Sequence, residues 1–473
     1  MRIGWTRAVV PLFILGAVLS PVLGASPQYK DVCASGCTYS SVQAAIDSIT
    51  DSSSTNVYTV FIDSGVLQSD NSITTNGKDY INFVGRGMGV SVLQASPTWY
   101  SRAAALQTGA SFFDFTDSTN VVVSNLTIDA RSTDPGNVRT SVALYGAKVD
   151  PGSGGKIVFD GSEVQGIYAA MWDDGPLADG LVELFGSKLR GVQYGGYVSN
   201  DKWHIFSSDL RAVDSGGSSW TVTAVTALLV VTGEATVWGS HLHAESAQPN
   251  KTYYVNGLSV SVTGSVTVNV IGSTSHVKMT TTSIASSNRI MAGASITKGT
   301  ANFTGTEFLY ENTGGALSQG RMAGLQLGGS GTINLAGCTF RDAGGSGGTS
   351  RSDLVSPNSS STVQLHVAGT RITSAVNATG TTLPPSVVKG ISAIASQRGS
   401  ATFTGSNTVP VTLPVALPDT NYTVGLSGSA SETVWVSNKT TSGFTLNSSN
   451  ATSTATVDWL VTGCSFGSTN CGF

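Results

Sequence analysis

The chain has 473 residues, of which only 11% are charged and 56 are glycine. Typical soluble domains carry about 25% charged residues, so this composition favours extended β structure with many tight turns over a string of compact globules. The net charge of −4 gives no general attraction to nucleic acid or to anionic membranes, and neither is an expected partner.

The first 24 residues have the pattern of a secretory signal peptide. Two arginines precede the largely apolar run 8–19, and the small residues Gly24 and Ala25 follow it. We therefore expect residues 1–24 to be removed and the protein to be secreted. Because prolines interrupt the segment, an N-terminus retained in lipid is the minor alternative. No later run approaches the ~20 apolar residues that a membrane span needs.

The five cysteines suit an oxidising compartment. Cys33 lies close to Cys37 and Cys464 lies close to Cys471, so we expect two local disulfides that leave Cys338 unpaired. No histidines or cysteines have the spacing of a structural zinc site. Neither a metal nor a cofactor is expected.

A short amphipathic helix is predicted over residues 39–49, YSSVQAAIDSI. Its apolar residues recur at helical spacing, and Ser40 with Gln43 forms a capping-box signature. A solenoid must cover its terminal strands or risk pairing at the open edge. The helix is therefore expected to close the first coil of such a fold.

A repeat runs from about residue 156 to 408. Each copy contains one glycine or serine that we call the pivot. Apolar residues lie two and four positions before the pivot, and a small residue directly follows it. The pivots are Gly161, Gly186, Ser207, Gly239, Gly272, Gly305, Gly337, Gly369 and Gly405. Period-two alternation indicates strands, and its phase shift at the pivot indicates a corner where glycine accepts a positive φ. Cys338 occupies the column of small residues, which predicts a buried, unreactive thiol rather than a nucleophile.

These repeats predict an all-β fold, with a right-handed parallel β-helix over residues 25–408. A propeller needs about 40 residues per blade, and a sandwich would not keep one column small and polar in every copy. After residue 409 the pattern changes to alternating strands divided by Pro, Asp-Thr and Ser-Gly turns. We expect a small antiparallel β-sandwich over residues 409–473.

Two outward columns follow the pivots. One contains Glu163, Lys188, Asp209 and His241, and the other contains Gln165, Arg190, Arg211, His243 and His276. Because coils stack about 4.8 Å apart, the second column predicts a row of cations. Arg190 and Arg211 are therefore candidate ligands for the carboxylates of an acidic polysaccharide. The alternative is a solvated face on which Glu163 and Asp209 balance the charges.

Histidines and tryptophans within the repeat offer further candidates. His241 and His243 lie two residues apart on one strand face, but the sequence places no further ligand beside them, so surface histidines are the better interpretation. Trp172 and Trp238 are candidate platforms for stacking on sugars, whereas Trp203 lies in an inward column and is expected in the core.

The N-terminal segments CTYSSVQAAIDSI, YTVFIDSGVL and YINFVGRGMGVSVL resemble pectin methylesterases and, more loosely, the pectin-lyase-like superfamily. The resemblance covers roughly residues 30–200. It implies a β-helix and two catalytic aspartates, one acting as acid and one as nucleophile. The stretch FDGSEVQGIYAAMW places Ala169 at the acid's position, and Gly191 places Tyr194 at the nucleophile's position. Neither residue can perform carboxylate chemistry, so pectinesterase activity is not expected.

The C-terminal module resembles the small sandwiches of H-type lectins and tail-fibre tips. Gly443, Phe444 and Trp459 carry most of this resemblance. Large apolar residues of this kind are expected in a core, so the resemblance predicts a fold rather than a ligand.

Two functions remain open from the sequence. The first is association with an extracellular, possibly acidic polysaccharide, or a surface or structural role, without catalysis. The second is an active lyase or glycoside hydrolase, for which Asp173 and Asp174 in WDDG offer paired carboxylates. The sequence does not determine the oligomeric state.

Overall fold

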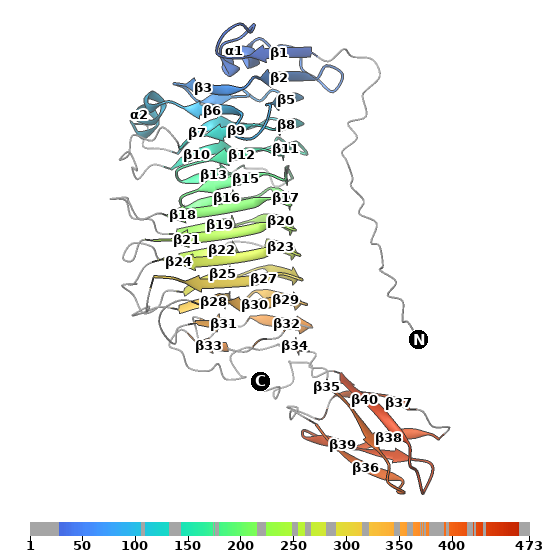
Figure 1. Cartoon of the computed structure of the whole chain (residues 1–473). Helices are drawn as coiled ribbons and strands as arrows, with labels where there is room; N and C mark the ends of the chain where they lie inside the picture. Colours follow the sequence, from blue (N-terminus) through green and yellow to red (C-terminus); the bar gives the residue numbers. More distant parts are fainter. Residues whose placement is uncertain are drawn as a thin grey trace.

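The computed structural model shows a stack of coils, each built from short parallel strands (Figure 1). It describes residues 28–105, 109–131, 143–173, 175, 179–214, 224–247, 254–260, 266–280, 290–314, 321–344, 351–356, 363–368, 370, 372, 375–377, 392–393, 397–413, 420, 422–428 and 432–462. Three parallel sheets run along the stack, so the predicted parallel β-helix is confirmed.

The first sheet contains the strand that precedes each predicted corner. In spatial order its strands are β1 (Gln28–Val32), β2 (Tyr58–Ile62), β5 (Ile81–Val84), β8 (Val121–Ser124), β11 (Lys156–Asp160), β14 (Leu181–Phe185), β17 (Lys202–Phe206), β20 (Gly233–Trp238), β23 (Val266–Ile271), β26 (Thr300–Thr304), β29 (Thr332–Ala336), β32 (Gln364–Ala368) and β34 (Ser392–Ala393).

The second sheet contains the strand that follows each corner. Its strands are β3 (Gly65–Ser69), β6 (Ser91–Ala95), β9 (Thr127–Asp129), β12 (Glu163–Gln165), β15 (Lys188–Gly191), β18 (Asp209–Asp214), β21 (His241–Ser246), β24 (Thr274–Met279), β27 (Glu307–Asn312) and β30 (Thr339–Asp342).

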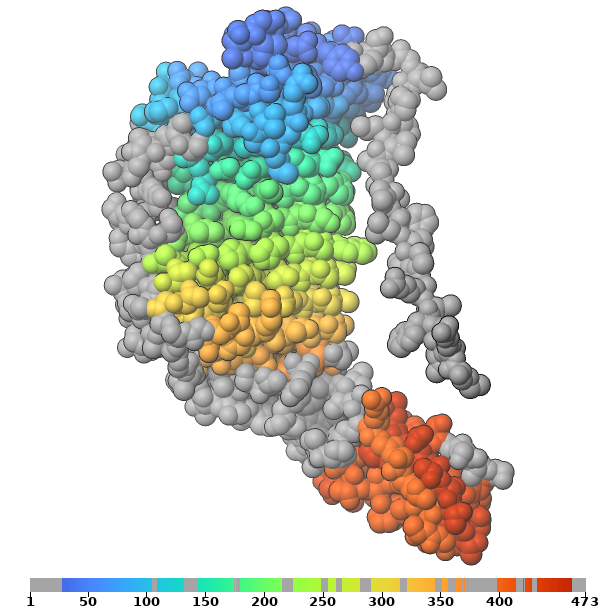
Figure 2. Space-filling view, viewed as in Figure 1, coloured from blue at the N-terminus to red at the C-terminus, as the bar shows by residue number. Residues whose placement is uncertain are grey.

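The third sheet completes each coil before the chain returns to the first. Its strands are β4 (Ile73–Thr74), β7 (Ala110–Asp114), β10 (Leu144–Lys148), β13 (Ala169–Trp172), β16 (Tyr194–Val198), β19 (Ala224–Val230), β22 (Tyr254–Val260), β25 (Ile290–Ile296), β28 (Arg321–Leu327), β31 (Arg351–Ser356) and β33 (Ala375–Asn377). Figure 2 shows the coils of the stack as successive bands of colour in sequence order.

The predicted corners form as expected between the first and second sheets. Seven pivots from Gly161 to Gly337 have φ values between 49° and 60°, including Ser207 as the one residue among them with a side chain. An earlier corner at Asn125, with φ 53°, escapes the sequence repeat because asparagine replaces glycine there. Gly369 lies outside the described residues.

The small residues after the pivots form a buried ladder. The amide of Ser187 donates to Ser208 Oγ at 3.1 Å, and the amide of Ser208 donates to Ser240 Oγ at 3.1 Å. Inward apolar columns on either side pack into one continuous core, in which Trp203 is fully buried as expected. Cys338 is 5% exposed, which confirms its predicted burial, and this burial raises the pKa of its thiol.

The expected capping helix is α1 (Val42–Asp47), which packs on β1, β2 and β4. Its N-cap is Ser41, whose Oγ accepts a hydrogen bond from the amide of Ala44, so the assignment of Ser40 was wrong by one residue. A second helix, α2 (Pro97–Ala105), was not predicted. No helix among the described residues is long and apolar enough to cross a membrane.

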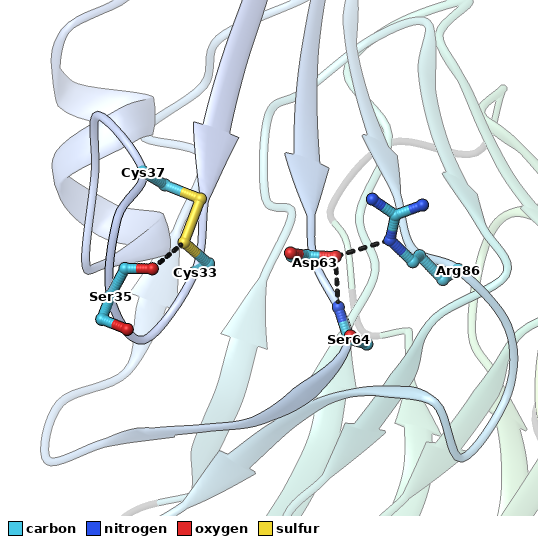
Figure 3. Close-up of a disulfide and its surroundings, with 6 residues drawn as sticks. All are labelled: Cys33, Ser35, Cys37, Asp63, Ser64 and Arg86. Carbon is cyan, nitrogen blue, oxygen red and sulfur yellow. Dashed lines mark hydrogen bonds and ion pairs between the residues drawn. A yellow bond between two sulfur atoms is a disulfide. The ribbon is translucent and has the colours of Figure 1, made fainter.

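The first expected disulfide, between Cys33 and Cys37, is present beside β1 (Figure 3). Nearby, the guanidinium of Arg86 pairs with the carboxylate of Asp63. Residues 1–24 of the expected signal peptide and the cysteines Cys464 and Cys471 lie outside the described residues.

The C-terminal module consists of two three-stranded antiparallel sheets. One has the order β35 (Gln397–Thr402), β40 (Thr456–Thr462), β37 (Thr423–Gly428), and the other has the order β36 (Thr408–Thr412), β39 (Gly443–Ser448), β38 (Val434–Thr440). Phe444 and Trp459 are buried in its core, as expected.

The expected boundary at residue 408 places the end of the solenoid too late. The ninth copy of the repeat, around Gly405, begins within β35, which pairs antiparallel with β40 of the C-terminal module. The copy matched because alternation and a glycine turn are common to both kinds of sheet. Only the pairing partner, which the repeat does not specify, distinguishes them.

Candidate functional site

The third sheet carries a group of aromatic residues on three successive coils. This aromatic cluster consists of Tyr145 on β10, Tyr168 directly before β13, Trp172 at the end of β13, and Tyr194 and Tyr197 on β16. Tyr194 is 8% exposed, and the other four residues are half-buried. The third-sheet residues that fill the core, such as Met171 and Val198, alternate with them.

The ladder of hydrogen-bonded strands brings these rings into contact. Trp172 is the register partner of Tyr197, and their rings stack with centroids 3.6 Å apart. On its other face the indole stacks on Tyr145, with a centroid distance of 4.8 Å. Tyr168 packs edge-on against Tyr194 at 5.3 Å. The rings therefore hold one another in fixed positions.

This stacking changes the expected role of Trp172. Because Tyr145 and Tyr197 cover both faces of the indole, the ring has no free face for a sugar. Its Nε1–H group is buried and has no hydrogen-bond partner within the described residues. Trp172 is thus the centre of the cluster rather than an exposed platform. Trp238, by contrast, is 56% exposed on the first sheet, outside the cluster.

The two positions that the resemblance assigns to catalytic aspartates lie side by side in this cluster. Ala169 and Tyr194 are direct register partners on β13 and β16. Ala169 is fully buried, and burial raises the pKa of the Tyr194 hydroxyl, which stays protonated. The site that the resemblance identifies therefore contains a methyl group and a phenol instead of two carboxylates.

Asp173 lies inside the solenoid, contrary to the expectation of an accessible acid. Its side chain is fully buried and accepts hydrogen bonds from the amides of Gly175 and Ser199 and from Trp203 Nε1. Burial, and then the charge of Asp201, raise the pKa of Asp173 to about 9. A carboxyl group enclosed in this way has no access to a polymer. Asp174 lies outside the described residues.

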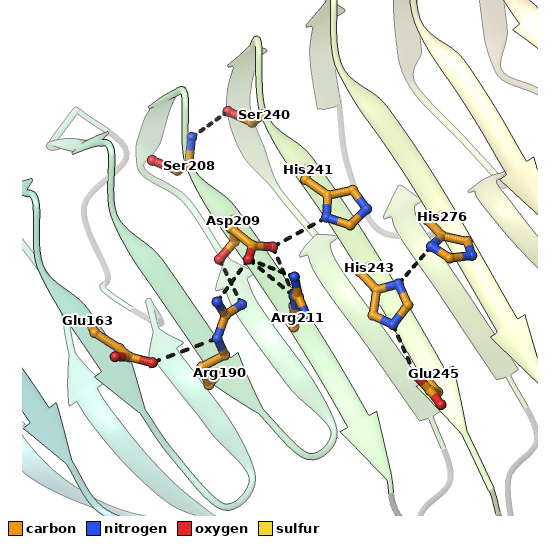
Figure 4. A network of polar contacts seen from close by, with 10 residues as sticks. All are labelled: Glu163, Arg190, Ser208, Asp209, Arg211, Ser240, His241, His243, Glu245 and His276. Atoms are coloured by element: carbon orange, nitrogen blue, oxygen red, sulfur yellow. Dashed lines mark hydrogen bonds and ion pairs between the residues drawn. The ribbon is translucent and has the colours of Figure 1, made fainter. Parts of the chain in front are cut away.

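The second sheet carries the predicted columns in the expected register. Arg190 is the partner of Arg211, Arg211 of His243, and His243 of His276 (Figure 4). Stacking of equivalent positions is therefore confirmed. Between the two interpretations of this row, an acidic-polysaccharide site and a charge-balanced face, the contacts of its side chains are informative.

The charges of this face compensate one another. Arg190 Nη2 lies 2.8 Å from Asp209 Oδ2, and Arg190 Nε lies 3.7 Å from Glu163 Oε1. Arg211 Nη2 also pairs with Asp209 Oδ2, at 3.1 Å. Although burial opposes ionisation, hydrogen bonds from His241, Arg190 and Arg211 hold the pKa of Asp209 well below its usual value. Because Arg190 and Arg211 are engaged, the compensated-charge alternative describes this face better than an open uronate site.

His243 differs from the expected surface position, whereas His241 remains partly exposed. His243 is 7% exposed and His276 is 9% exposed, so both rings are buried. The register places His276 directly beside His243, which supplies the further histidine that the sequence did not place. The signal was present in the column of residues four positions after the pivot, which contains both.

Tyr145, Tyr168 and Tyr197 were not predicted as site residues. Tyr197 could have been found from the repeat, because Trp172 and Tyr197 both lie eleven residues after their pivots, Gly161 and Gly186. Tyr145 belongs to a coil whose corner is Asn125, which the repeat did not include.

Comparisons with known proteins show similarity of fold. No protein-family model matches the sequence, and no curated protein matches it. Similar solved structures include the A-module of mannuronan C-5 epimerase AlgE6 from Azotobacter vinelandii, with 14% identity, 70% of this chain and 93% of that chain covered, and a TM-score of 0.33.

Two other similar structures are a phage protein and a plant enzyme. The tailspike gp61 of Pseudomonas phage phi297 has 12% identity, with 89% of this chain and 91% of that chain covered and a TM-score of 0.31. The pectin methylesterase from carrot has 9% identity, with 73% and 84% covered and a TM-score of 0.30. Pectin methylesterases are therefore among the neighbours in structure, as the sequence resemblance implied. Similarity at this level describes the fold alone.

Proposed function

We propose that the chain binds an extracellular polysaccharide through the aromatic cluster of the third sheet and has no pectinesterase activity. The observation that carries this proposal is the stack of Tyr145, Trp172 and Tyr197 across three successive coils, with Tyr168 and Tyr194 beside it. Aromatic side chains with a polar tip suit surfaces that are apolar at one end and hydrated at the other, as sugars require.

The chemistry of the cluster suits hydroxyl-rich ligands. Burial raises the pKa values of Tyr168 and Tyr194, so both phenols are neutral and able to donate hydrogen bonds. Gln193 Nε2 lies 3.3 Å from the Tyr194 hydroxyl, which adds an amide to the same patch. Ring edges provide apolar contact with sugar C–H groups, while hydroxyl groups provide direction.

The rigidity of the cluster also supports binding. A side chain that is held before the ligand arrives loses little rotamer freedom on binding, which reduces the entropic cost of association. The stacked rings of Trp172 and Tyr197 are held in this way by their backbone register. The disulfide between Cys33 and Cys37 supports an oxidising location, consistent with secretion.

Affinity electrophoresis in gels containing a panel of neutral and uronate polysaccharides tests the proposal. We expect one polysaccharide to retard the unmodified protein. Trp172→Ala should weaken that retardation at least tenfold, and Tyr168→Phe, which removes only a hydroxyl group, should weaken it less. The matched control is Trp238→Ala, which removes an exposed tryptophan from the first sheet. If Trp238→Ala abolishes the retardation while Trp172→Ala leaves it unchanged, the binding site lies outside the aromatic cluster.

Enzyme assays test the second part of the proposal. The same polysaccharides are incubated with the protein and assayed for methanol, reducing ends and unsaturated products. We expect no methanol, because Ala169 and Tyr194 occupy the positions of the two carboxylates. Release of methanol that is lost in Tyr194→Phe would overturn the proposed absence of esterase activity.

A further inference from the structure

Three histidines gather on the outward face of β21 and β24, separate from the aromatic cluster. His241 and His243 lie on β21, and His276 lies opposite His243 on β24 (Figure 4). The nearest ring nitrogens of His243 and His276, both Nδ1, are 2.9 Å apart. One ring nitrogen from each of the three residues lies within 4.8 Å of the others.

We propose that His241, His243 and His276 form a zinc-binding site. Zinc binds imidazole nitrogen at about 2.0–2.1 Å, so two ligands of a tetrahedral ion are roughly 3.3 Å apart. The facing nitrogens of His243 and His276 are already near this separation. His241 is the most exposed of the three, with 36% of its side chain accessible, and a small side-chain rotation would complete the set.

Each histidine has a carboxylate at a ring nitrogen. His243 Nε2 lies 3.2 Å from Glu245 Oε2, and His276 Nε2 lies 3.5 Å from Glu311 Oε2. His241 Nδ1 lies 3.4 Å from Asp209 Oδ1. Metal-binding histidines commonly face a carboxylate on the side away from the metal, because this fixes the tautomer and increases the basicity of the ligating nitrogen. Here Glu245 is hydrogen-bonded to Nε2 of His243, which directs Nδ1 of that ring at Nδ1 of His276, whereas Nε2 of His276 makes no hydrogen bond within the described residues.

The fold holds His243 and His276 close together. Both residues are buried, and their Nδ1 atoms face each other at 2.9 Å. At this distance the two nitrogens either share one hydrogen in an N–H···N hydrogen bond or, with that hydrogen released, both bind an ion in its place.

The surrounding charges and ligand types favour zinc over harder cations. Arg211, Lys278 and Arg341 lie near the histidines, while Asp209, Glu245 and Glu311 offset them. Calcium and magnesium require several oxygen ligands, and the carboxylates here face the outer nitrogens of the rings. Imidazole is a preferred ligand of zinc. Three protein ligands leave a fourth position for water or for a group of a bound molecule.

Isothermal titration calorimetry tests this site. The full chain, without a tag and treated with a chelator, is titrated with zinc chloride. We expect one zinc ion per chain, and we expect His243→Ala and His276→Ala each to weaken binding at least 100-fold. Glu245→Gln should weaken it about 10–100-fold through the orientation of His243. His204→Ala is the matched control, because His204 lies on β17 of the first sheet and also faces a carboxylate, that of Glu183.

Two further measurements keep the result decisive if a variant at a buried position misfolds. His241→Ala changes the most exposed ligand and should weaken zinc binding while the circular dichroism spectrum is unchanged. Cobalt substituted into the unmodified chain should give the intense visible absorption of a tetrahedral site. Absence of stoichiometric zinc binding, or equal binding by His241→Ala and the unmodified chain, would overturn the proposal. Preference for calcium over zinc would overturn it as well.

Discussion

The ionisation of Asp173 shows how the surroundings of a single side chain determine its pKa. The sequence places it in a polar turn, WDDG, where an exposed acid is the simplest expectation. In the structure it is fully buried against Trp203 and influenced by Asp201, which is also fully buried. Desolvation and a like charge both penalise ionisation, so the pKa of Asp173 rises to about 9 and that of Asp201 to about 6.

This pair predicts a fall in stability with increasing pH. Unfolded carboxyl groups have pKa values near 4, so the native state retains protons that the unfolded state has lost. The stabilisation is complete below about pH 4 and is lost as the pH rises through about 6 and on to about 9. Urea unfolding midpoints measured from pH 5 to 9 should therefore decrease.

Asp201→Asn should flatten this profile, because the amide removes the neighbouring charge and still accepts the hydrogen bond from the amide of Gly180. The matched control is Asp63→Asn. The Arg86 ion pair lowers the pKa of Asp63, which therefore titrates below this window. Identical slopes in Asp201→Asn and the unmodified protein would show that the pair does not determine the pH dependence.

At the scale of elements, the corner between the first and second sheets determines the shape of each coil. Gly186, Gly239 and Gly272 have φ values of 53°, 57° and 54°, and Ser207 adopts 49° at the same position. A left-handed conformation costs a residue with a Cβ atom about 1–2 kcal/mol, whereas glycine adopts it freely. Glycine recurs in this column because the bend is the same in every coil.

Two substitutions of opposite sign test this explanation. Ser207→Gly should raise the free energy of unfolding, and Gly272→Ala should lower it, each by about 1 kcal/mol after the greater flexibility of unfolded glycine is included. A Cβ atom at Gly272 meets no atom within 4 Å, so the effect of Gly272→Ala would come from the backbone alone. Urea denaturation followed by circular dichroism measures both changes. Stabilisation by Gly272→Ala would contradict the explanation.

At the scale of the whole molecule, α1 covers the first coil. Val42, Ala45 and Ile46 form its buried face, and the helix contacts β1 and β2. A helix of this length is not stable in water by itself, so packing on the coil maintains it. Removal of this cover would expose apolar residues and the end of a parallel stack, both of which favour association between chains.

Ile46→Asp should therefore detach α1 and cause self-association. Burying an unpaired carboxylate in place of a fully buried isoleucine costs at least about 3 kcal/mol, which exceeds what a single short helix can retain. Size-exclusion chromatography with light scattering should show larger species for this variant. Ala44→Asp places the same charge on the exposed face of α1 and should behave like the unmodified chain. Equal masses for both variants would indicate that α1 is not a protective cap.

The sequence by itself determined the parallel β-helix, its glycine corners and the stacking of the columns next to them. These features depend on local rules: alternation specifies a strand, and a bend with positive φ requires glycine or a tolerant polar residue. The same rules identified the apolar face of α1. They also predicted that Arg190, Arg211, His243 and His276 would stack, because each lies four residues after its pivot.

Only the tertiary structure decided what the stacked residues do. Asp173 directly follows β13, and it is buried through contacts with Ser199 and Trp203 of the next coil, which the local sequence WDDG does not specify. Trp172 meets Tyr145 and Tyr197 only through strand pairing between coils. Likewise, His243 and His276 are 33 residues apart in sequence and become neighbours through their register. Contacts of this range depend on the length of every intervening loop, which no local pattern specifies.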